Sequence, residues 1–137
     1  MRHSVLAMIL AALLATPLVM AQISLHATAP FAFNARGHTL PAGEWTLARI
    51  DALAAGHLWT LKDSEWRGQL LVVGNAAYRQ PDGRTSLMFN CYSGRCFLSE
   101  IRWPGGAGTH LPACEAEKNL LLAGVKPERT VLFARLR

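Results

Sequence analysis

The sequence lacks the short motifs that mark the commonest catalytic and nucleotide-binding sites. No serine between residues 64 and 99 lies in a Gly-x-Ser-x-Gly elbow, so the usual hydrolase nucleophile is missing. The three cysteines lack the two-residue spacing of thiol oxidoreductases. The Gly-rich run "GGAG" has no lysine after it and is not a phosphate-binding loop. The sequence therefore predicts no catalytic residues and no cofactor.

Charged residues are also sparse, at 17% of the chain, and they do not cluster. Lysine and arginine number 14 against 9 aspartates and glutamates. The basic residues recur singly along the chain, whereas a nucleic-acid binder usually concentrates them in a stripe. We therefore expect a mildly basic, solvated surface and no nucleic-acid partner.

The one long uncharged run lies at the beginning. Arg2 precedes an uncharged run from Val5 to Met20, and the segment closes with Val19, Met20 and Ala21. These are the parts of a secretory signal peptide, which we assign to residues 1–21. As a membrane span the run is too short, because crossing the hydrocarbon takes about 20 apolar residues and Pro17 interrupts it. The sequence predicts an exported protein, periplasmic or extracellular, with no stable membrane span after cleavage.

Residues 22–137 have the size of one domain. From Ile23 to Phe33 apolar residues alternate with polar ones, as in a strand with one buried face, and Pro30 marks an edge or a bend. Further short strand-like runs are separated by Gly, Pro and Asp: residues 45–50, 57–62, 69–77, 84–92, 95–103 and 130–136. We expect a mainly β domain, an antiparallel β-sandwich or barrel-like sheet of about six to eight short strands.

One segment departs from this rhythm. Residues 112–123 begin with a proline, carry Glu115 and Glu117 early, and are followed by Gly124, which are the start and stop signals of a helix. Alanines at 113, 116 and 123 can share a face with Leu120. The sequence predicts one amphipathic helix, packed on the sheet before the last strand.

Three stretches occur in a fixed order along the chain: an aromatic first strand with an "LPAGEW" turn, the strand "FLSEIRW", and the helix start "LPACEAE". Together they resemble small exported proteins of unknown function that are numerous in soil bacteria. The resemblance implies an exported β-rich domain and brings no activity or cofactor with it. The cysteines are not part of the shared pattern.

The stretch "CYSGRC" is the most distinctive feature of the chain. If Ser93 and Gly94 form a two-residue hairpin loop, Cys91 lies directly opposite Cys96 and the two can form a disulfide. A three-residue loop with a bulge would instead pair Cys91 with Arg95. A disulfide that closes so short a loop is expected to contribute only about 2 kcal/mol.

Two alternatives remain for the cysteines. Cys91, Cys96, His110 and Cys114 have the ligand types of a structural zinc site, although their spacing is loose. Cys114 is otherwise a small buried residue, an unpaired thiol, or a competitor for the bridge between the other two.

Trp66, in the polar stretch "DSEWRG", is the best candidate for an exposed aromatic, whereas Trp45 and Trp59 are expected in the core. Taken together, the sequence favours a non-enzymatic binding or envelope-associated module, whose partner is a protein or glycan of the cell envelope. An edge strand would let a partner strand add to the sheet. The alternative is a small envelope enzyme, either a hydrolase or a thiol redox protein.

Overall fold

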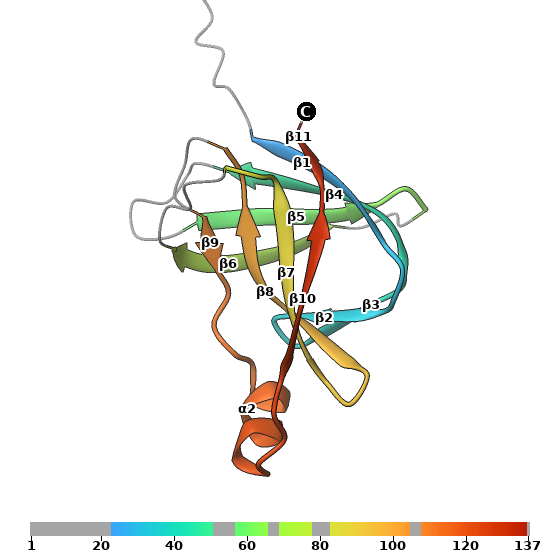
Figure 1. Ribbon diagram of the computed structural model, residues 1–137. Helices are drawn as coiled ribbons and strands as arrows, with labels where there is room; N and C mark the ends of the chain where they lie inside the picture. Colours follow the sequence, from blue (N-terminus) through green and yellow to red (C-terminus); the bar gives the residue numbers. More distant parts are fainter. Residues whose placement is uncertain (1–22, 51–56, 66–68, 78–82, 105–107, 137) are drawn as a thin grey trace, which may run out of the picture.

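A computed structural model of the chain describes residues 23–50, 57–65, 69–77, 83–104 and 108–136. Within them the protein is mainly β, with eleven strands and one helix (Figure 1). No described helix is long and apolar enough to cross a membrane. The strands are β1 Ser24–Ala29, β2 Phe33–Ala35, β3 His38–Leu40, β4 Gly43–Ile50, β5 His57–Asp63, β6 Leu70–Ala76, β7 Ser86–Tyr92, β8 Arg95–Arg102, β9 Thr109–His110, β10 Glu128–Phe133 and β11 Arg135–Leu136.

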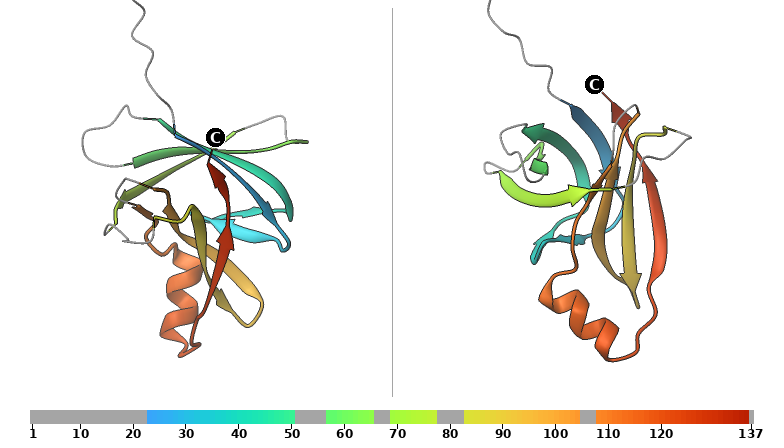
Figure 2. Two further views of the ribbon diagram at one scale, coloured as in Figure 1. Left: turned by 45° about the horizontal axis from the view of Figure 1, so that its top comes forward. Right: turned by 90° about the vertical axis from the view of Figure 1, so that its left-hand side faces the viewer.

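The strands form two layers that face each other across the core (Figure 2). The first layer has the order β1-β4-β5-β6, and the second contains β10, β7, β8 and β9, with the β2–β3 hairpin beside β8. Each strand turns alternate side chains inward, so both layers contribute large apolar residues to one core. Trp45, Leu47 and Trp59 come from the first layer, and Phe89 and Leu98 from the second.

The last strand joins the two layers at one side. Its first part, β10, pairs with β7, and after Ala134 its final residues, β11, pair with β1. The Ala134 amide also donates to the carbonyl of Thr85 at 3.0 Å, which keeps the chain extended between the two strands. On the other side, β9 pairs with both β6 and β8 and joins the layers there.

The β-rich class is confirmed, but the expected number and direction of the strands are wrong. The structure has eleven strands, and β2 runs parallel to β8, so the sheet is mixed. The additional strands are short. Arg36 and Gly37, with φ of 51° and 93°, make a tight two-residue hairpin loop where the sequence indicated only a turn. Such a loop leaves room for three-residue strands that periodicity cannot reveal.

The helix α2 spans Glu115–Leu122, within the predicted range. It ends in a Schellman motif, in which the amide of Val125 donates to Leu120 and that of Gly124, with φ 81°, donates to Leu121. The packing face is close to the expected one, since Ala113, Ala116 and Leu120 are half-buried and only Ala123 is exposed. The residue that the sequence missed is Glu117, which lies on the same face and is the buried residue of the helix. Burial in α2 therefore centres on a carboxyl group.

Candidate functional site

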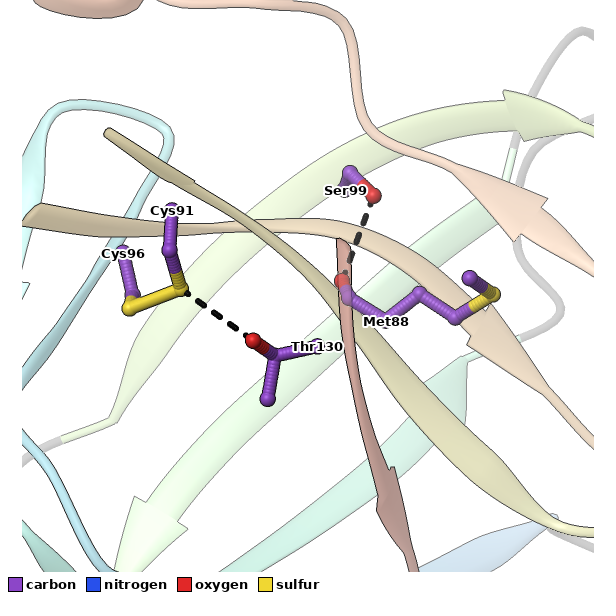
Figure 3. The surroundings of a disulfide bond; sticks show 5 residues. All are labelled: Met88, Cys91, Cys96, Ser99 and Thr130. Atoms are coloured by element: carbon purple, nitrogen blue, oxygen red, sulfur yellow. Dashed lines mark hydrogen bonds between the residues drawn. A yellow bond between two sulfur atoms is a disulfide. The ribbon is translucent and has the colours of Figure 1, made fainter. Parts of the chain in front are cut away.

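The "CYSGRC" segment forms the predicted two-residue hairpin. Ser93 and Gly94 have φ of 49° and 88°, and Tyr92 faces Arg95. Cys91 therefore lies opposite Cys96, with their α-carbons 4.0 Å apart, and the two form a disulfide (Figure 3). On the neighbouring strand β10, the hydroxyl of Thr130 lies 3.6 Å from the Cys91 sulfur. The disulfide prediction is confirmed, and the three-residue loop is not adopted.

Cys114 lies on the opposite face of the same layer. Cys96 pairs in register with Phe33 and belongs to the core, while the next pair along the strands is Phe97 with Asn34. Because successive side chains point to opposite faces, Asn34 points away from the core. The Cys114 sulfur is 3.9 Å from the Asn34 carboxamide oxygen and is therefore on that outer face as well. Cys114 is a free thiol and does not compete for the bridge.

The zinc interpretation is not supported by this arrangement. Two of its four ligands, Cys91 and Cys96, are joined to each other, and Cys114 lies across the layer from them. His110 is exposed on β9. Within the described ranges, no three His, Cys, Asp or Glu side chains are grouped so that they could hold a metal ion.

A buried polar contact fixes α2 to the outer face of the second layer. The Tyr92 hydroxyl donates to the Glu117 carboxylate at 3.3 Å, and the two residues are only 1% and 5% exposed. Burial raises the pKa of Glu117 above its ordinary value, although the Tyr92 hydrogen bond and the charge of His110 oppose this shift. Burial, together with the Glu117 charge and hydrogen bond, raises the pKa of Tyr92 to about 12, so its hydroxyl remains a donor.

The tryptophans are mostly structural. Trp45, Trp59 and Trp103 are each no more than 6% exposed, which confirms the prediction for the first two. The Trp59 indole donates to the Thr109 hydroxyl at 2.9 Å, and His57 Nδ1 lies 2.6 Å from the same hydroxyl. This network anchors β9 between the layers and gives His57 a structural role. Trp66 lies outside the described residues.

A groove lies at the join between β1 and the last strand. β11 pairs only with Leu25 and His26, after which β1 continues along β4 while β10 follows β7. Figure 1 shows β1 and β10 diverging below this point. The groove between them, which we call the seam groove, has a volume of about 580 Å³. It is lined by His26, Ala27, Thr28, Glu44, Trp45, Phe133, Arg135 and Leu136.

The seam groove is bordered by two backbone edges. Among the described strands, none pairs with Ala27–Ala29 on the side away from β4, and none with β10 on the side away from β7. Unpaired amide and carbonyl groups of this kind are the template on which an added strand forms hydrogen bonds. The groove therefore offers main-chain donors and acceptors as well as side chains.

The side chains of the seam groove are chemically mixed. Phe133 and Leu136 are 61% and 47% exposed and offer apolar surface. Glu44 and Arg135 are exposed and carry opposite charges. His26 Nδ1 lies 3.2 Å from the Thr46 hydroxyl, while its Nε2 is buried without a hydrogen-bond partner among the described residues. The described lining residues include no serine, cysteine or lysine, and Thr28, His26 and Glu44 are the lining residues whose types can act as nucleophiles.

Sequence reasoning placed none of these groove residues in a site. The strand 130–136 was expected, but not that it would leave one layer for the other at Ala134. Residues 130–136 show no alternation of polar and apolar residues, since Val131 and Phe133 share a phase with Arg135, so this run gave no signal of a site. Comparison with protein-family models, with curated proteins and with solved structures finds no match to this chain.

Proposed function

We propose that the protein is an exported, non-enzymatic binding module that holds an extended polypeptide segment in the seam groove. The observation that carries the proposal is the pair of unpaired strand edges bordering a groove of about 580 Å³. That volume is within the usual range of ligand sites, roughly 300–1,000 Å³. A peptide added beside Ala27–Ala29 would take the position that the last strand leaves when it turns toward β7.

The mixed lining supports a peptide over a single small metabolite. In strand addition the main-chain hydrogen bonds give affinity, and pockets for alternate side chains give specificity. Phe133 and Leu136 offer contact to apolar side chains, while Glu44 and Arg135 offer contact to charged ones. The groove can thus contact both the apolar and the charged side chains of a peptide in which the two alternate.

The Cys91–Cys96 disulfide supports export, since such bonds persist in oxidising compartments. The basic start and apolar run of residues 1–21 support the same proposal. Intact mass of the protein recovered from a bacterial periplasm tests it. We expect a chain that begins at Gln22 and carries one disulfide and one free thiol. A chain that retains residues 1–21 would contradict cleavage.

Peptide binding can be tested with a phage-displayed library of random dodecapeptides selected on the purified protein. The affinities of the enriched peptides are then measured for the wild-type protein and for two variants. Thr28→Trp fills the groove from an exposed position of β1, while Lys62→Trp adds the same side chain on β5 of the same layer, outside the groove. We expect Thr28→Trp to weaken binding at least about tenfold and Lys62→Trp to leave it unchanged. Equal binding to all three proteins would refute the groove as the site.

A second measurement separates strand addition from side-chain recognition. Each amide of an enriched peptide is methylated in turn, which removes one hydrogen-bond donor at a time. Because alternate amides of a strand point to opposite edges, strand addition predicts losses at every second position. A loss pattern without this period would contradict pairing with the β1 edge.

A further inference from the structure

The first layer has a second open edge, on β6. Residues Leu70–Gly74 pair with β5 on one side. On the other side, the described strands reach β6 only through β9, which pairs with Asn75 and Ala76. Leu70–Gly74 therefore have no strand partner on this side among the described residues, although Gly74 packs closely against residues 109–111. This edge lies across the layer from the seam groove.

Next to this edge the outer face of the layer is apolar. Leu71 and Val73 are 58% and 50% exposed, while Val72 between them is buried in the core. Val73 pairs with Leu58 of β5, and Leu58 pairs with Ile50 of β4, so a row of three apolar residues crosses the layer. Figure 2 shows α2 on the other layer, away from this face. The described residues thus leave an apolar patch beside a free edge.

The sequence of β6 has none of the features that protect edge strands. Residues 69–77, "QLLVVGNAA", contain no charged residue and no proline. The β5–β6 register is continuous, with no bulge. Natural proteins usually protect an exposed edge with lysine, proline, a bulge or a covering segment, since a bare edge pairs with other chains. A long uncharged edge of Leu and Val is therefore expected to be paired in the native assembly.

We propose that the partner of this edge is β6 of a second copy of the same chain, paired antiparallel about a two-fold axis at Val72. Identical strands related by such an axis bring the same residues together, so any charge near the axis would face its own kind. β6 has no charge and carries no such penalty. Leu71 of one copy would lie opposite Val73 of the other, and the two apolar patches would become continuous.

This interface is separate from the seam groove and does not depend on the proposed function. It is tested by sedimentation equilibrium of the whole chain. We expect a dimer, and we expect Val73→Lys to raise its dissociation constant at least about tenfold. The matched control is Val131→Lys, since Val131 is 46% exposed on the outer side of β10, in the other layer. A monomeric wild-type protein, or a Val73→Lys dimer as tight as the wild type, would overturn the proposal.

Cross-linking tests the register and does not depend on a charged variant that could perturb folding. Leu71→Cys and Val73→Cys are made separately, each with Cys114→Ser to remove the free thiol. In the proposed register, position 71 of one copy faces position 73 of the other copy, within disulfide range. Position 71 of one copy lies only diagonally from position 71 of the other, and the same holds for position 73. Mild oxidation should cross-link the mixture and leave each variant alone largely uncross-linked. A mixture that forms no covalent dimer would overturn the proposal.

Discussion

The two faces of the β7–β8 pair are buried by different chemistry. On the inner face, Phe89 meets Phe31 and Phe33 edge to face, at ring centroid distances of 5.2 and 5.3 Å, and the disulfide lies beyond them. On the outer face, Tyr92 meets Phe97 and donates a hydrogen bond to Glu117 of α2. The inner face is packed by apolar rings alone, while the outer face also contains a hydrogen bond to a buried carboxyl group whose pKa is raised by burial.

This difference assigns separate roles to the two faces. Apolar packing is insensitive to pH and is lost only when the core is disrupted. A carboxyl with a raised pKa instead links the docking of its helix to proton concentration. We therefore expect the inner face to set the stability of the domain and the outer face to set its response to pH.

The largest expected effect follows from removing the central aromatic ring of the inner face. Phe89→Ala leaves a cavity in fully buried surroundings, and such substitutions cost about 3–5 kcal/mol. The matched control is Phe133→Ala, because Phe133 is 61% exposed and should change the free energy of unfolding by less than about 0.5 kcal/mol. Urea denaturation measures both. Similar losses from the two variants would remove the distinction between core and surface.

A smaller effect is expected from the disulfide at the end of the same face. Replacing Cys91 and Cys96 together with serine should lower the free energy of unfolding by about 2 kcal/mol, because the bond closes only a short loop. Reducing agent should destabilise the wild type by a similar amount and leave the double variant unchanged. Cys114→Ser is the control and should have little effect. If Cys114→Ser alone removed the sensitivity to reductant, the bridge would involve Cys114 instead.

Local patterns predicted most of the elements on both faces. Alternation of apolar and polar residues predicted the strands near 86–92 and 95–102. Turn chemistry predicted the two-residue loop at Ser93 and Gly94, and with it the disulfide. Such signals reside in a few adjacent residues, which is why a single sequence carries them. The helix followed in the same way from its proline, early acids and terminal glycine.

The candidate site could not be predicted in this way. The seam groove exists because β1 and the last strand, more than 100 residues apart, pair for two residues and then separate. No local pattern specifies that separation. Similarly, Glu117 was interpreted only as an acid favourable to a helix start, and its burial depends on Tyr92 from a distant strand. Contacts between distant segments decide both the groove and the burial of Glu117.

The smallest effect, and the one that tests the outer face most directly, is expected from Glu117→Gln. Because burial raises the pKa of Glu117 in the folded state, the protonated form is favoured there. The stability that the protonated Glu117 contributes is fully present below the unfolded-state pKa and is lost as pH rises through the folded-state pKa.

The Glu117→Gln variant keeps the shape of the side chain and an acceptor for Tyr92, but glutamine does not ionise. The variant should therefore gain stability relative to wild type as pH rises from 4.5, the ordinary pKa of the carboxyl group, toward neutral pH, as measured by urea denaturation at each pH. Glu115→Gln, on the exposed side of the same helix turn, should show no such change. A constant difference between Glu117→Gln and wild type over this range would mean that the outer face is not linked to protons, and that the two faces differ in composition alone.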